Sequence, residues 1–227
     1  MLRVVVADPH PLVLDGVASL IRSSAPDIEW SGAATGWADL TALVNRAPAR
    51  PHVVVVEPAL GSPAECTAGV RELAGRGIAV VAFTGDLRPV PIRRAVEAGA
   101  RSVVLKRDPA PALLDAIRCA ATGEFSTSGP WARSLVFDSR LTPRLAPREE
   151  EVLHLLASGM PRKVIGRHMS PPVALTTVVT YLNRICEKYR ELGRTVACPA
   201  DAMRAAAEDG FLDLGGSYPA TVARAAS

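Results

Sequence analysis

Residues 53–58 read Val-Val-Val-Val-Glu-Pro, and this stretch decides the fold. Four consecutive β-branched residues predict a short strand, because branched side chains pack well on extended backbone. No polar residue alternates with the valines, which is typical of a strand buried on both faces of a sheet. Such a strand belongs to a parallel sheet with helices on both sides, so strands and helices should alternate around it.

The first 122 residues show this alternation. Strand-like stretches besides Val53–Glu57 are Leu2–Ala7, Ile28–Ala34, Ile78–Phe83 and Ser102–Lys106. Segments of helix length follow them at 11–24, 36–47, 64–75, 90–98 and 110–122. We therefore predict an α/β domain over residues 1–122, with a flavodoxin-like, five-stranded parallel sheet.

The rest of the chain has a different pattern. Residues 123–144 are rich in Gly, Ser, Thr and Pro and are predicted to form a linker. An all-helical domain is expected over 145–212. Its first helix should begin at Pro147, and three more should cover residues 161–169, 174–189 and 200–209. Residues 213–227 show no periodicity, which predicts a disordered tail.

Composition bounds the class of protein. The chain has 227 residues, 48% of them apolar and 22% charged, which is typical of a globular protein with two domains. Its apolar runs are far shorter than the ~20 residues of a membrane span, and no signal peptide is apparent. Four scattered cysteines argue against a zinc site and a disulfide framework. We expect a cytoplasmic protein without membrane association.

Positive charge is concentrated in the second domain. Residues 141–195 contain nine basic and five acidic residues, a net charge of +4, whereas residues 1–122 have a net charge of only +1. A basic excess confined to one segment is typical of a surface that meets phosphate, although an ordinary solvated helical surface would look the same.

The functional residues of the first domain should lie where its strands end. In open parallel sheets the binding crevice lies at the carboxyl ends of the strands. Those ends carry Asp8, Glu57, Thr84 and Lys106.

Two groups of motifs resemble a known family. The order of Asp8-Pro9, Glu57-Pro58, Phe83-Thr84 and Leu105-Lys106 is similar to the receiver domain of two-component response regulators. The stretch from Leu145 to Gly159, with Pro147-Arg148-Glu149, resembles the start of a LuxR-type helix-turn-helix. Together they resemble the NarL/FixJ family over about residues 1–212, which implies a DNA-binding transcription regulator.

The resemblance also implies a phosphorylation site, from which this sequence departs. The family phosphorylates an aspartate and binds Mg²⁺ through it and two further acidic residues; here Glu57 and Pro9 occupy two of those three positions. Because a hard cation requires several oxygen ligands, we expect no aspartyl phosphorylation, no metal and no cofactor. The predicted degenerate site of this pseudo-receiver consists of Asp8, Pro9, Glu57, Thr84 and Lys106.

We predict an ion pair between Glu57 and Lys106. One interpretation is that the carboxylate imitates the phosphorylated state; the other is that the pair only satisfies two semi-buried charges. A third possibility is that the vacant crevice binds a small-molecule effector, which the sequence does not identify.

The helix at 174–189 is the candidate recognition helix, because its apolar stripe leaves a polar face outward. The predicted DNA-binding residues are Arg162, Lys163, Thr177, Thr180, Tyr181, Asn183, Arg184 and Lys188. Val179 replaces the lysine of the family pattern, Ser170-Pro171-Pro172 lengthens the turn, and Gly166 is expected to weaken the preceding helix.

The sequence therefore predicts a regulator that binds promoter DNA as a homodimer, with the helix at 200–209 as a candidate dimer surface. The alternative is an interaction module without DNA binding that forms heterodimers with a related regulator. Enzyme classes find no support, because no Gly-rich phosphate loop, Gly-x-Ser-x-Gly or His-Glu-x-x-His motif is present.

Overall fold

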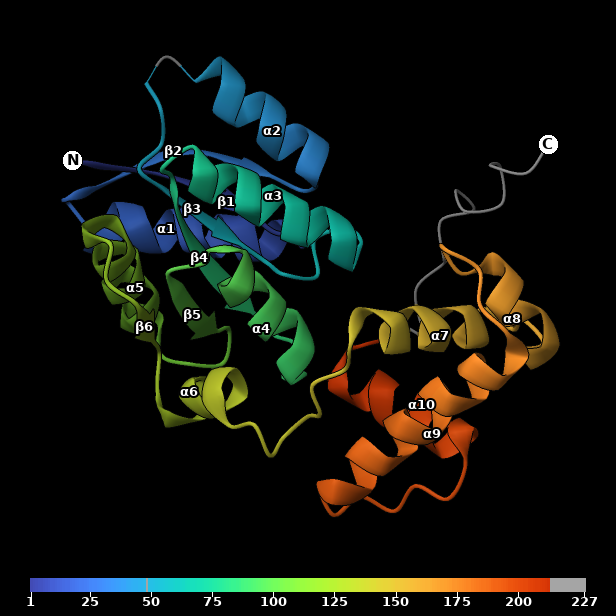
Figure 1. Ribbon diagram of the computed structural model, residues 1–227. Helices are drawn as coiled ribbons and strands as arrows, with labels where there is room; N and C mark the ends of the chain where they lie inside the picture. Colours follow the sequence, from blue (N-terminus) through green and yellow to red (C-terminus); the bar gives the residue numbers. More distant parts are fainter. Residues whose placement is uncertain (48, 213–227) are drawn as a thin grey trace. The chain divides into compact units, whose positions relative to one another are not determined.

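The computed structural model describes residues 1–47 and 49–212 (Figure 1). The chain forms two compact units, Met1–Asp138 and a second unit that starts at Ser139. The predicted tail at 213–227 lies outside the described residues. In the part of the chain that the structure describes, no helix combines the length and the apolar character that a membrane span requires.

A parallel sheet forms the centre of the first unit. Its strands lie in the order β2-β1-β3-β4-β5-β6. Their bounds are β1 Leu2–Ala7, β2 Ile28–Ala34, β3 Val53–Val56, β4 Ala79–Thr84, β5 Ser102–Leu105 and β6 Ser126–Thr127. All four valines of β3 are fully buried, as their lack of alternation predicted. The predicted parallel α/β fold is confirmed, with six strands instead of five.

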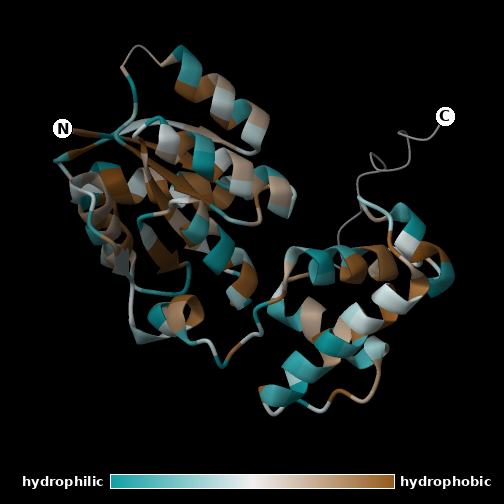
Figure 2. Ribbon diagram, viewed as in Figure 1, coloured by the Kyte–Doolittle hydropathy of each residue, from teal (hydrophilic) through white to brown (hydrophobic). Residues whose placement is uncertain are grey.

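Helices cover both faces of this sheet (Figure 1). Their bounds are α1 Pro11–Ser24, α2 Trp37–Arg46, α3 Pro63–Gly75, α4 Pro89–Ala98 and α5 Ala110–Thr122. Apolar residues of α1 and α5 share one core cluster with β1 and β3, while α2, α3 and α4 lie on the other face. Figure 2 shows the strands as a brown, hydrophobic centre between these layers.

The prediction of a linker over 123–144 was wrong for its first part. Strand β6 pairs with β5, and the hydroxyls of Ser102 and Ser126 are 2.8 Å apart. Helix α6 (Pro130–Phe137) is tied to α4, because Arg93 donates to the carbonyls of Leu135 and Asp138. Backbone pairing, the bonds of Arg93 and the buried side chains of Ala132, Leu135 and Val136 hold this segment in the first unit.

The second unit consists of helices α7 (Pro147–Ala157), α8 (Arg162–His168), α9 (Leu175–Glu191) and α10 (Pro199–Asp209). Helix α9 packs against the other three helices. Its buried stripe contains Val178, Leu182, Ile185, Cys186 and Tyr189, at the predicted helical spacing. The four predicted helices are confirmed, with α9 two residues longer at its end.

Gly166 has a different role from the predicted one. The carbonyl of Gly166 accepts a hydrogen bond of 2.8 Å from the amide of Val173, which brings the α8–α9 connection back against α8. A Cβ atom at position 166 would lie 2.3 Å from the carbonyl oxygen of Val173. Glycine therefore permits the close approach of two backbone segments, and this approach sets the turn.

Candidate functional site

A lysine bridges two buried carboxylates at the carboxyl edge of the sheet. Asp8, Glu57 and Lys106 each follow the last residue of a strand, namely β1, β3 and β5. The Nζ atom of Lys106 lies 2.5 Å from Oδ2 of Asp8 and 2.8 Å from Oε2 of Glu57. Asp8 is 1% exposed and Glu57 is 5% exposed. The predicted Glu57–Lys106 pair is confirmed, and the same ammonium also serves Asp8.

Backbone amides complete the surroundings of both carboxylates. Oδ1 of Asp8 accepts from the amide of His10 at 2.9 Å. Oε1 of Glu57 accepts from the amide of Ala59 at 3.2 Å, and its Oε2 accepts from the amide of Gly85 at 3.3 Å. Both acidic side chains therefore have donors from their own unit.

The electrostatics of this cluster keep Lys106 charged. Burial alone would lower the pKa of its ammonium, but the hydrogen bonds to Asp8 and Glu57 outweigh burial, so the pKa lies above its usual value. One positive charge thus faces two negative ones. The imidazole of His10 lies against the same carboxylate, with Nδ1 3.0 Å from Oδ1 of Asp8, and remains exposed to solvent.

Thr84 is the remaining predicted side chain of the crevice. It is fully buried at the end of β4, and its Oγ1 accepts a hydrogen bond of 2.9 Å from the amide of Asp86. This bond holds the threonine in the turn that follows β4. Pro9 is exposed and has no side-chain oxygen.

The polar face of α9 is a second candidate site. Thr180, Asn183 and Arg184 are exposed, whereas Thr177 and Tyr181 are half-buried. The hydroxyl of Thr180 donates to the carbonyl of Thr176 within the same helix. The three exposed side chains recur at intervals of three and four residues, so they share one face of the helix.

The predicted basic residues divide into two kinds. Arg162 and Lys163 are exposed at the start of α8. Lys188 is engaged within the unit: its ammonium lies 2.6 Å from Oε2 of the buried Glu149 and donates to the carbonyl of Arg144. The same Glu149 oxygen accepts from the amide at the start of α7. Lys188 therefore joins α9 to the beginning of α7, which removes it from the set of free cations on α9.

Two curated proteins that are similar to this chain in sequence are response regulators or transcriptional regulators. The transcriptional regulatory protein LiaR of Bacillus subtilis is 30% identical over 208 residues, which cover 87% of this chain and 95% of LiaR. The nitrate/nitrite response regulator NarL of Escherichia coli K12 is 29% identical over 208 residues, 86% of this chain and 92% of NarL. The chain belongs to the NarL/LuxR family of response regulators. No protein-family model matches it.

Solved structures agree with the two-part fold of this NarL/LuxR-family chain. A structure of two RcsB dimers bound to DNA covers 91% of this chain and 98% of RcsB, with a TM-score of 0.62 and 20% identity. RcsB of Salmonella enterica serovar Typhimurium bound to the rprA promoter gives a TM-score of 0.64 at 17% identity. At these identities the likeness concerns the fold.

The magnesium site implied by the NarL/LuxR family does not fit this chain. Pro9 supplies no side-chain ligand, and Oδ2 of Asp8 is already paired with the ammonium of Lys106. Over residues 1–47 and 49–212, no three His, Cys, Asp or Glu side chains are grouped so that they could hold a metal ion.

Some residues at both sites were missed by the sequence analysis. His10 and the amide of Gly85 belong to the crevice, and Glu149 is the partner of Lys188. Glu149 carries a sequence signal, because a glutamate in the first turn after Pro147 is typical of a helix start. The contact of Gly85 depends on a turn conformation for which the sequence has no pattern.

Proposed function

We propose that this chain is a DNA-binding transcription regulator that acts without aspartyl phosphorylation. The observation that supports this most directly is the bridge of Lys106 between Asp8 and Glu57. A phosphoryl acceptor requires a free carboxylate oxygen in line with the donor and a cation that neutralises the transferred group. Here backbone amides and Lys106 already bind the carboxylates, and position 9 is a proline.

The proposed partner of the second unit is double-stranded promoter DNA. RcsB dimers are seen bound to DNA, and this chain shares their fold. The exposed face of α9 has Thr180, Asn183 and Arg184, whose groups can bond to base edges and phosphates, and Arg162 and Lys163 add positive charge. We further propose a homodimer in which each protomer reads one half-site.

Phosphorylation is tested by incubating the full-length protein with acetyl phosphate and Mg²⁺ and measuring its intact mass. We expect no species heavier by one phosphoryl group. A phosphorylated species that disappears in the Glu57→Gln variant would overturn the proposal.

DNA binding is tested with pooled genomic fragments across a salt series, without any phosphodonor. We expect particular fragments to be enriched, with affinity falling steeply as salt rises, because phosphate contacts release counterions. If no fragment is retained even at low salt, DNA binding is excluded under these conditions, and the alternative of an interaction module that pairs with a related regulator is favoured.

A further inference from the structure

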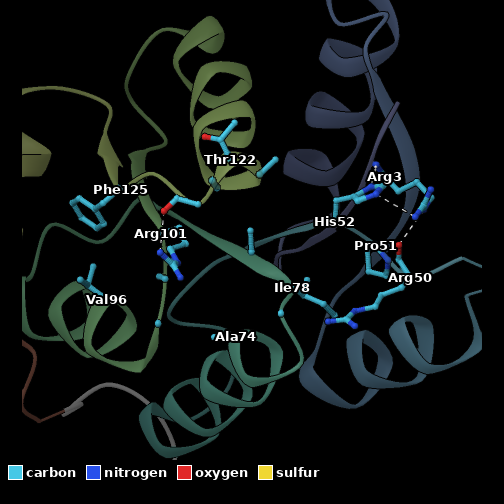
Figure 3. Close-up of a pocket in the computed structure, with 17 residues that line it drawn as sticks. Arg3, Arg50, Pro51, His52, Ala74, Ile78, Val96, Arg101, Thr122 and Phe125 are labelled. Atoms are coloured by element: carbon cyan, nitrogen blue, oxygen red, sulfur yellow. Dashed lines mark hydrogen bonds between the residues drawn. The ribbon is translucent and has the colours of Figure 1, made fainter.

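The first unit has a second pocket at the amino ends of the strands, whereas Lys106 lies at their carboxyl ends. It has a volume of about 870 Å³, within the ~300–1,000 Å³ typical of small-molecule sites. The pocket lies beside the first residues of β4 and β5 and the last residues of α5 (Figure 3). Its charged and ionisable lining residues are Arg3, Arg50, His52 and Arg101, and no carboxylate lines it.

The guanidinium groups of this pocket have no acidic partners. Among the described residues, Arg3, Arg50 and Arg101 make no ion pair, whereas Arg88 and Arg118 elsewhere in the unit each pair with an aspartate. Arg101 uses one N–H group to bond the carbonyl of Gly123, and Arg3 uses its Nε–H to bond the carbonyl of Arg50. A guanidinium has five N–H donors, so most of this hydrogen-bonding capacity remains available.

Two donors face each other beside β1. The backbone amide of Arg3 donates to Nδ1 of His52 at 2.9 Å, so the neutral ring carries its proton on Nε2. Partial desolvation and the charge of Arg3 lower the pKa of His52, which keeps the ring neutral at pH 7. A terminal nitrogen of Arg3 lies 3.3 Å from Nε2. Both nitrogens are donors, and an anionic oxygen beside them would satisfy both.

An alternative role for the arginines is only to neutralise the partial negative charge at the helix C-termini beside the pocket. The turns at Gly99 and Gly123 end α4 and α5, and the last carbonyls of a helix carry partial negative charge. Arg101 fits that role through its bond to Gly123. Arg50 fits it as well, because its guanidinium lies beside Gly77, just after the end of α3. The role does not account for the two donors at Arg3 and His52.

Apart from Thr122, the other side chains that line the pocket are apolar. They include Val96, Ile78 and several alanines, and Phe125 at one end is 41% exposed. Figure 3 shows Phe125 on the side of Arg101, apart from the group formed by Arg3, Arg50 and His52. A ligand that spans the pocket would therefore meet the donors of Arg3, Arg50 and His52 at one end, and the ring of Phe125 with the guanidinium of Arg101 at the other.

We propose that this pocket binds a small molecule that combines phosphate groups with a planar aromatic ring, the chemistry of a nucleotide. Guanidinium groups bind phosphate through paired, charge-assisted hydrogen bonds, and the planar group would contact Phe125. This site is separate from the crevice at Lys106 and does not depend on how the second unit meets DNA.

The test is isothermal titration of the full-length protein with ADP and with pyrophosphate at fixed ionic strength. We expect saturable binding of both probes, with ADP at least about tenfold tighter because of its base. Arg50→Ala and Arg101→Ala should each weaken ADP about tenfold, because each removes charged hydrogen bonds. Arg107→Ala, which removes a guanidinium at the opposite edge of the same sheet, is the matched control and should bind ADP as the wild type does.

Several results would overturn the proposal. Absence of saturable binding, or wild-type affinity in both Arg50→Ala and Arg101→Ala, would show that the pocket holds no such ligand. Equal affinity for pyrophosphate and ADP would show that the planar group does not contribute to binding. Circular dichroism of the variants checks that a lost affinity is not a lost fold.

Discussion

At the scale of single residues, Lys106 allows two acidic side chains to be buried at the ends of β1 and β3. An uncompensated carboxylate in the interior is costly, and here one ammonium and three backbone amides compensate two of them. The cluster is therefore sensitive to the loss of its single cation.

Replacing Lys106 by methionine should lower the free energy of unfolding of the first unit by about 3 kcal/mol, because both buried carboxylates lose their counter-ion. Urea denaturation measures the change. Lys163→Met, which removes an exposed lysine of α8, is the control and should change stability by less than about 0.5 kcal/mol. Equal stability of the Lys106 variant and the wild type would contradict this account.

The raised pKa of Lys106 predicts a dependence on pH. A lysine in the unfolded chain titrates near pH ~10.4, whereas the folded ammonium keeps its proton to higher pH. The stabilisation is therefore fully present below about pH 10 and is lost as pH rises through the folded pKa. Urea denaturation from about pH 8 upward should show the wild type approaching Lys106→Met at the alkaline end. A constant difference between the two proteins would rule this out.

At the scale of elements, two basic residues of α9 have different surroundings. Arg184 is exposed on the polar face, whereas Lys188, one turn later, binds the buried Glu149 of α7. Substitution of these two basic residues should therefore have different effects, one on DNA affinity and the other on stability.

Arg184→Ala should weaken DNA binding at fixed salt about tenfold and leave stability unchanged, whereas Lys188→Ala should lower stability by about 2 kcal/mol. Fluorescence anisotropy with an enriched fragment and urea denaturation measure the two effects. Unchanged DNA affinity in Arg184→Ala would show that the recognition face is misplaced.

Gly166→Ala should destabilise the second unit by about 2 kcal/mol, because the new Cβ atom meets the backbone of Val173 and cannot be accommodated without a shift. Gly16→Ala is the matched control: it lies in a helix with open space around its Cβ position and should stabilise the first unit by up to about 1 kcal/mol. Thermal denaturation followed by circular dichroism compares the two. A neutral effect at position 166 would mean that the turn adapts freely.

The elements also show what the sequence could predict. The stripe of Val178, Leu182 and Ile185 predicted α9 because burial of one helix face leaves a repeat of 3.6 residues. Strand β6 was missed because its two residues, Ser126 and Thr127, join the sheet through backbone atoms. The Glu57–Lys106 pair was predicted from the resemblance to receiver domains, whose lysine is present here as Lys106. The pairing of Lys188 with Glu149, 39 residues apart, depends on how α7 and α9 pack, which periodicity does not encode.

At the scale of the whole molecule, the end of the first unit matters for any fragment. Ala132, Leu135 and Val136 of α6 are buried in this unit, beyond the predicted boundary at residue 122. A fragment of residues 1–138 should therefore unfold cooperatively, and a fragment of residues 1–122 should melt at a lower temperature, because it loses β6, α6 and the bonds of Arg93. Calorimetry of both fragments tests this, and equal melting temperatures would restore the shorter boundary.

An ion pair within one chain forms when the chain folds and, below the pKa of its lysine, persists for as long as the chain stays folded. The bridge at Lys106 therefore has no lifetime set by chemical reactions. An acyl phosphate, by contrast, is made by one reaction and decays by another. If no phosphodonor modifies this crevice and the chain regulates transcription as proposed, the amount of the protein, set by its synthesis and degradation, determines the strength of that regulation.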